Sequence, residues 1–97
     1  MSIKRLQEAK EFEWDQGNLE KNWLKHGVSP IECEQVFFNQ SFIAPDVKHS
    51  EQEDRFFALG RTDLDRYLFL VFTLRRHKIR IISARNMNRK ERKIYGS

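Results

Sequence analysis

The stretch Y-L-F-L-V-F-T-L, Tyr67 to Leu74, decides the fold of this 97-residue chain. Successive side chains of a strand point to opposite faces of a sheet, and here both alternating rows are almost wholly apolar. A strand with one wet face would instead alternate apolar and polar residues. We therefore expect residues 67–74 at the centre of a sheet, with other elements covering each face.

Shorter strand patterns lie on both sides of this stretch. Strands are predicted at 11–14, 41–44, 55–61 and 79–84, a loop at 46–53, and turns at 62–66 and 75–78. The strand at 41–44 should end before Pro45, since the residue before a proline favours extended backbone.

Two helices are expected between the first two strands. The first begins near residues 15–18 and ends at Gly27, a residue that readily adopts the left-handed C-cap conformation. Its apolar positions predict an inward stripe of Leu19 and Trp23 that His26 can extend. The second runs from Pro30 to about Phe38.

Capping signals mark the start of the second helix and of a third. Ser29 is a good N-cap, and Glu32 completes a capping box with it. Cys33, Val36 and Phe37 should face inward from this helix. Asn88 with Glu91 predicts a final helix over 88–95.

The predicted order is β-α-α-β-β-β-β-α, which indicates an α+β fold on an antiparallel sheet. The length suits one domain covering 1–97. Residues 1–10 are expected to form a flexible leader. We find no repeat and no internal linker.

Composition argues against several classes of protein. A single cysteine, Cys33, leaves no internal disulfide and no cysteine cluster for zinc, and it is expected to be a small buried residue. The three histidines lie far apart, and no HExxH or Walker motif is present, so we expect neither a metal site nor a cofactor. No signal peptide or ~20-residue apolar span is present, which favours a cytoplasmic location.

Charge is segregated along the chain. Residues 75–97 carry nine of the 18 Lys and Arg residues and a single acid, Glu91, within a net charge of +4. A basic end favours a polyanion such as RNA. A solvated helix face neutralised by an acidic partner protein would give the same composition.

The last predicted strand carries two arginines in R-I-I-S-A-R (80–85). Regular alternation places Ile79 and Ile81 toward the core, with Arg85 leaving that row at the strand end and Arg80 on the opposite face. Arg80, with Arg55 on a neighbouring strand, could hold a phosphate, because guanidinium matches phosphate geometry. In the alternative interpretation, these arginines bind no phosphate, and their long side chains simply extend to place the charged groups in water.

An ordered set of motifs extends from residue 12 to residue 95. The motifs are F-E-W-D (12–15), N-x-x-K-H-G-V-S (22–29), V-F (36–37), E-x-R-x-x-x-x-G (53–60), R-I-I-S-A-R (80–85) and E-R-x-x-Y (91–95). In this order they resemble the BrnT family of type II toxins. The resemblance implies a RelE-like ribonuclease inhibited by a BrnA-like antitoxin with a ribbon-helix-helix domain. The sequence departs from the family pattern at Pro30 and at Asn86-Met87.

The resemblance implies metal-independent RNA cleavage that arrests translation. Arg55, Arg80 and Arg85 would contact the phosphate and stabilise the transition state, and they are expected to converge on one pocket. His26 and Lys25 are candidates for proton transfer or RNA positioning. Glu53 and Glu91 are candidate bases or, equally, carboxylates that orient an arginine. The remaining RNA-binding candidates are on the last helix: Arg89, Lys90, Arg92 and Tyr95, the last of which either stacks on a base or packs on the sheet.

Two other interpretations remain open at this point. One is a noncatalytic nucleic-acid-binding module that uses the basic helix 88–95. The other is a degenerate toxin retained as an interaction or repressor component. The resemblance implies a 2:2 complex with antitoxin and DNA contact only through that antitoxin. The lack of a long apolar span predicts no membrane contact.

Overall fold

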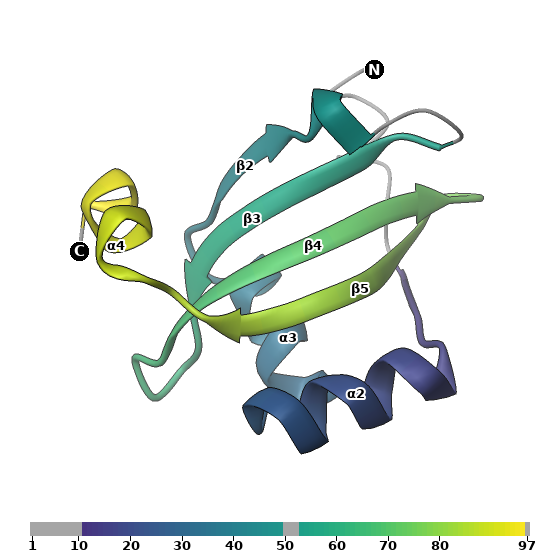
Figure 1. Ribbon diagram of the computed structural model, residues 1–97, viewed down its shortest axis with the longest axis horizontal. Coiled ribbons are helices and arrows are strands. Elements are labelled where there is room, and N and C mark those ends of the chain that lie inside the picture. The colour runs from purple at the N-terminus through teal and green to yellow at the C-terminus, as the bar shows by residue number, and fades with distance from the viewer. Residues whose placement is uncertain (1–10, 50–52, 97) are drawn as a thin grey trace.

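The computed structural model describes residues 11–49 and 53–96, and its centre is a five-stranded sheet of order β1-β5-β4-β3-β2 (Figure 1). The strands are β1 (Glu11–Glu13), β2 (Phe42–Pro45), β3 (Arg55–Arg61), β4 (Tyr67–Arg75) and β5 (Lys78–Asn86). The helices are α2 (Gln16–His26), α3 (Pro30–Phe38) and α4 (Arg89–Tyr95), with one 3-10 turn, η1 (Val47–His49). This order confirms the predicted one. The predicted leader, 1–10, lies outside the described residues.

The sheet is mixed, although β2 to β5 are antiparallel neighbours as expected. The exception is β1, which pairs with β5 in parallel through Phe12 and Ile79. No hairpin joins these two strands, because β1 begins the described chain and β5 comes near its end, so no turn imposes an antiparallel direction. β2 extends through Pro45 because it is an edge strand, where a missing N–H is tolerated.

The core lies between the sheet and α3. One face of β4 contributes Leu68, Leu70 and Phe72, which are completely buried. Cys33 and Val36 of α3 pack into the same cluster, as the capping box and the inward stripe predicted. Burial raises the pKa of the Cys33 thiol to about 12, so this cysteine serves as a core residue.

The helix α2 covers the free edge of β5 rather than burying an apolar stripe. Asn18 Nδ2 donates to the carbonyl of Ile81 at 3.4 Å, and Asn22 Oδ1 accepts from the Ala84 N–H at 3.2 Å. Beyond Arg80, where β1 stops pairing, these asparagines satisfy backbone groups of β5. The predicted inward stripe was therefore wrong for Trp23, which is 60% exposed, because the buried face of α2 carries Asn22.

Gly60 in β3 permits the close approach of α3 to the sheet. A Cβ at this position would lie 2.6 Å from Val36 Cγ1, well inside contact distance. The motif glycine is therefore required by packing, not by an unusual backbone conformation.

The helix α4 lies at one end of the sheet, near the last residues of β5 (Figure 1). Its Ile94 lines an apolar groove with Phe57, Leu59 and Phe69. These sheet residues alternate with core residues such as Phe56 and Leu70, so α4 lies on the face opposite α3. Within the described residues the second face of β4 is covered unevenly: Phe69, which lines the groove beside α4, and Val71 are part-buried, whereas Thr73 is buried.

Candidate active site

A β-bulge in β5 decides where Arg85 points. Ser83 pairs with Val71, but the next pair joins Ile81 to Phe72, so Ile82 is an extra residue. The bulge reverses the alternation. Arg85, which pairs with Phe69, therefore lies on the same face of the sheet as Arg80, the face opposite α3, called the open face below. Arg85 does leave the row of Ile79 and Ile81, as expected, but it does so through the bulge and not through the end of the strand, since β5 continues to Asn86.

The guanidinium of Arg85 is held on three sides. Its two terminal nitrogens donate to the two carboxylate oxygens of Glu91, each at 2.8 Å, in a fork geometry. Nη1 also donates to the carbonyl of Asn86 at 3.0 Å. The guanidinium lies 4.3 Å from the centroid of the Phe69 ring. Arg85 is thus fixed at the end of a strand instead of moving freely in solvent.

The carboxylate of Glu91 is better suited to orient Arg85 than to act as a general base. Burial alone would raise its pKa, but hydrogen bonds from Arg85 and the Asn88 backbone lower the pKa below its ordinary value. The same carboxylate closes the capping box of α4 through Asn88. Of the two roles considered for Glu91, the geometry favours orienting Arg85.

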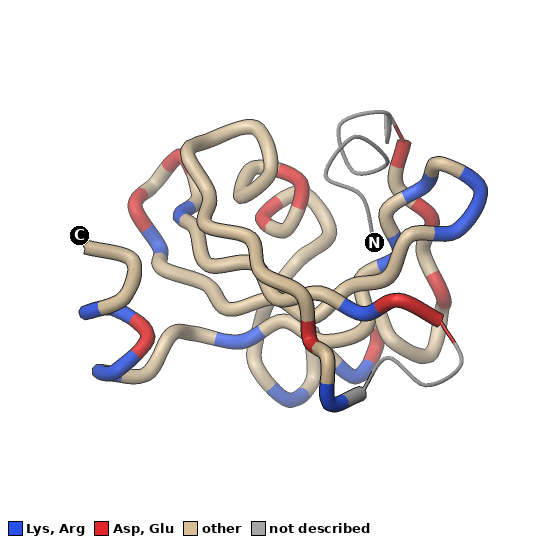
Figure 2. The backbone as a smooth tube through the Cα atoms, turned by 90° about the horizontal axis from the view of Figure 1, so that it is seen from above, with Lys and Arg blue, Asp and Glu red and all other residues tan. Residues whose placement is uncertain are grey.

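Basic side chains surround this end of the sheet. A hollow of about 540 Å³ is lined by Met87, Arg89, Arg92, Lys93 and Gly96. In Figure 2 the backbone of α4 is blue on both sides of its single acidic residue. The hollow is open and cationic, which suits a phosphate backbone.

The aromatic residues near α4 hold the helix against the sheet. Tyr95 packs edge-to-face on Tyr67 at 5.9 Å, and its hydroxyl donates to the Gln40 carbonyl at 2.6 Å. The Arg92 guanidinium lies 4.4 Å from the Tyr67 ring centroid. Of the two roles considered for Tyr95, packing on the sheet is therefore the one that is observed.

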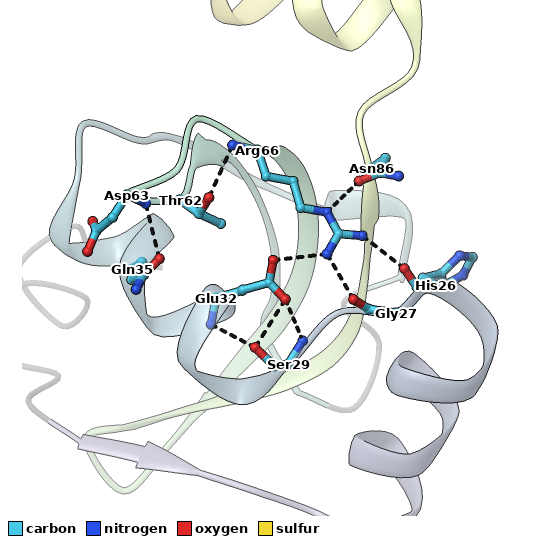
Figure 3. Close-up of polar contacts among 9 residues, drawn as sticks. All are labelled: His26, Gly27, Ser29, Glu32, Gln35, Thr62, Asp63, Arg66 and Asn86. Atoms are coloured by element: carbon cyan, nitrogen blue, oxygen red, sulfur yellow. Dashed lines mark hydrogen bonds and ion pairs between the residues drawn. The ribbon is translucent and has the colours of Figure 1, made fainter.

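The end of α2 lies at this same end of the sheet (Figure 1). It carries Lys25, which is exposed, and His26, which is half-buried. Gly27 has φ of 62° and forms the predicted C-cap. The imidazole of His26 points away from the polar contacts beneath it (Figure 3).

The other two candidate arginines lie farther along the open face. Arg55 pairs with Thr73, and Thr73 pairs with Arg80, so the three form one row across the sheet. Arg80 Nη2 lies 3.3 Å from an Asp15 carboxylate oxygen. Glu53, at the same end, is 3.3 Å from Arg75.

The three arginines share one face but do not converge on one pocket, which corrects the sequence prediction. On β4 the partners of Arg80 and Arg85 are Thr73 and Phe69, four residues apart. At the ordinary rise of a strand, four residues separate the Arg80 and Arg85 positions by about 13 Å along the sheet. Sequence reasoning did not identify Phe69 and Asp15 as the partners of Arg85 and Arg80, although Asp15 ends the F-E-W-D motif and Phe69 lies in the apolar stretch 67–74.

Two further findings concern metals and membranes. Within residues 11–49 and 53–96, no group of three His, Cys, Asp or Glu side chains is placed to hold a metal ion. No helix of that part of the chain is long and apolar enough to cross a membrane.

Comparison with known proteins identifies one family. Residues 14–91 match the model of a family described as the ribonuclease toxin BrnT of type II toxin–antitoxin systems. A solved structure, the ribonuclease toxin BrnT of Brucella abortus, is similar in fold, with a TM-score of 0.59 and 18% identity. The match covers 81% of this chain and 97% of the Brucella chain. No curated protein matches the sequence.

Proposed function

Because this chain belongs to the BrnT family of ribonuclease toxins, we propose that it cleaves RNA without a metal ion at the end of β5, with Arg85 at the scissile phosphate. The observation that carries this proposal is the fixed guanidinium of Arg85. It emerges from rigid strand backbone beside a cationic hollow, held by Glu91 and Phe69. Preorganised cations stabilise transition-state charge because they need no reorganisation during the reaction.

Arg85 retains donors for a substrate. Its contacts within the described residues use three of the five N–H groups of a guanidinium. Its side chain is 33% exposed. A phosphate oxygen can therefore accept from Arg85 while Glu91 remains bound.

The proposed reaction is an internal transfer of the phosphoryl group. A base takes the proton of a ribose 2′-hydroxyl, and the 2′-oxygen forms a new bond to the adjacent phosphorus. The bond from phosphorus to the 5′-oxygen breaks, and an acid protonates that oxygen. The products are a 2′,3′-cyclic phosphate and a 5′-hydroxyl, so water and metal are not consumed.

Roles for the other candidates follow from their positions. His26 and Lys25, at the end of α2, remain the candidates for proton transfer. The cations of α4 would hold the RNA backbone: Arg89, Lys90 and Arg92. Arg55 and Arg80 would contact a neighbouring phosphate of the same RNA, and Glu53 would orient a nearby arginine.

The family also implies a protein partner, because type II toxins are paired with an antitoxin. We propose that this partner is a BrnA-like antitoxin with a ribbon-helix-helix domain, in a 2:2 complex that contacts DNA through the antitoxin. The toxin would act as a single domain in the cytoplasm and inhibit translation by cleaving RNA.

The test is an RNA cleavage assay in excess EDTA with wild type, Arg85→Ala and Arg61→Ala. Arg61 is a matched control because it is exposed on β3 and its ion pair with Asp65 is long, at 3.7 Å. We expect a loss of at least 100-fold in Arg85→Ala, as for removal of one oxyanion donor, and little change in Arg61→Ala. Circular dichroism would verify that both variants are folded.

Three outcomes would contradict the proposal in different ways. Cleavage that stops in EDTA would remove the metal-independent mechanism. Equal cleavage by wild type and Arg85→Ala would place the chemistry elsewhere. An inactive wild type that binds RNA in a salt-sensitive way would instead support the noncatalytic binding module, whose basis is the cationic hollow on α4.

A further inference from the structure

Arg66 joins four segments of the chain through one guanidinium. It ends the turn between β3 and β4, and no sequence motif drew attention to it. Nη1 donates to the carbonyl of Gly27 at 2.8 Å, and Nη2 donates to the carbonyl of His26 at 2.9 Å (Figure 3). Nη1 also donates to a Glu32 carboxylate oxygen, and Nε to Asn86 Oδ1, both at 2.9 Å.

The carbonyl contacts complete the end of α2. The last carbonyls of a helix have no partner within the helix. Arg66 supplies hydrogen bonds for those of His26 and Gly27, at the point where the left-handed Gly27 ends α2. The backbone direction of His26, and of Lys25 before it, is therefore tied to the sheet.

The contact between Arg66 and the Glu32 carboxylate links the end of α2 to α3. Glu32 uses Oε1 to close the capping box with Ser29 and Oε2 to accept from Arg66. Burial would raise the pKa of Glu32, but the Ser29 backbone and Arg66 together lower it. Glu32 thus remains an anion facing the guanidinium.

Arg66 extends from backbone that is itself fixed. Its N–H donates to the hydroxyl of Thr62 at 3.1 Å, and its carbonyl accepts from the Thr62 N–H at 2.9 Å. Thr62 is 3% exposed. The Arg66 guanidinium therefore binds its four acceptors from a fixed backbone position.

The remaining contact leads to the candidate active site. Asn86, whose side chain accepts from Arg66, directly follows Arg85. The backbone carbonyl of Asn86 accepts from the Arg85 guanidinium. One residue thus fixes both the end of α2, with His26, and the end of β5, with Arg85.

We propose that Arg66 is a positioning residue for RNA cleavage, which sets the distance between the proton-transfer candidates on α2 and the phosphate-binding Arg85. This inference rests on the proposed function. A direct contact with RNA is disfavoured, because the described contacts use four of the five guanidinium N–H groups and the side chain is 29% exposed.

The first test compares Arg66→Lys with Arg61→Lys as a matched control. An ammonium carries a positive charge but cannot reproduce the fork that holds four acceptors. Because small misplacements of reacting groups cost up to about 100-fold, we expect kcat to fall about 10- to 100-fold in Arg66→Lys. KM should stay within about threefold, since the RNA-binding cations are unchanged. Arg61→Lys should match wild type.

A second pair of variants keeps the test valid if Arg66→Lys does not fold. Asn86 is exposed, so Asn86→Ala removes one acceptor without opening the core. We expect a kcat loss of about tenfold in Asn86→Ala and recovery in Asn86→Asp, which restores an acceptor for Arg66. The double variant Arg66→Lys/Asn86→Ala should lose no more than Arg66→Lys alone, because both changes break the same link.

The outcomes separate this inference from the function on which it rests. An inactive wild type would overturn the proposed function and this inference together. An active wild type with unchanged kcat in folded Arg66→Lys, or in Asn86→Ala, would overturn the inference alone. A rise in KM with unchanged kcat would also overturn it, because Arg66 would then act in RNA binding.

Discussion

Replacement of Glu91 by glutamine separates its two candidate roles. The variant Glu91→Gln keeps the size of the side chain, one acceptor for Arg85 and the ability to close a capping box. It removes the negative charge from a fork whose two hydrogen bonds are each 2.8 Å long. The perturbation is therefore confined to the charge and to one acceptor.

The structure sets the expected loss of stability. The Glu91 and Arg85 side chains are 14% and 33% exposed, so the pair lies between a surface ion pair and a buried one. Exposed pairs contribute up to about 1 kcal/mol, and hydrogen bonds to charged groups about 1.5–3 kcal/mol. We expect Glu91→Gln to lower the free energy of unfolding by about 1–2 kcal/mol. The melting temperature should fall by about 4–16 °C.

The activity assay is kcat measured against pH for RNA cleavage in EDTA. If Glu91 orients Arg85, kcat should fall by less than about tenfold, and the shape of the pH profile should not change. If Glu91 is the general base, the loss should be about 100- to 10,000-fold, and the limb that reports the base should disappear. Glu20→Gln, a change in an exposed carboxylate of α2, is the control. A loss above 100-fold with an unchanged melting temperature would refute the orienting role.

Two further predictions concern the fold. Gly60→Ala should destabilise the protein by about 1–3 kcal/mol in urea unfolding, because its Cβ would meet Val36 at 2.6 Å. Val36→Ala should relieve part of that cost, so additive effects in the double variant would contradict the packing argument. Stability should also fall as pH drops below about 4.5, because Glu32 and Glu91 have folded-state pKa values lowered from 4.5. Their contribution is present above the unfolded value and is lost as pH falls through the folded values. An unfolding midpoint independent of pH between 5 and 3 would show that neither carboxylate is stabilised by folding.

Local signals predicted the elements of this fold well. The capping boxes at Ser29 and Asn88 and the C-cap at Gly27 are all present. These features depend on residues three or four positions apart, so their geometry is encoded within a single turn. The apolar stretch 67–74 likewise predicted the central strand β4, although one of its two rows, with Tyr67, Phe69 and Val71, is only part-buried.

Prediction failed where a distant segment changes what a residue must do. Trp23 continued an apolar stripe, yet Asn22 is buried because α2 lies along an unpaired strand edge. Arg85 was expected to leave the core-facing row only at the end of the strand, because alternation cannot reveal that the extra residue Ile82 moves Arg85 to the opposite face within β5. Both errors have one cause, which is that hydrogen bonds between segments far apart in sequence override the local period.

For the candidate site too, some features could be predicted from the sequence and others depend on the tertiary structure. The sequence alone determined that cations gather near the end of the last strand, and its ordered motifs indicated the ribonuclease toxin family. Only the tertiary structure decided that Arg85 is clamped by Glu91 and separated from the row of Arg80. It alone revealed Arg66, whose partners lie between 20 and 40 residues away along the chain. A guanidinium binds acceptors that the fold brings together in space. Residue spacing along the chain does not show which acceptors these will be.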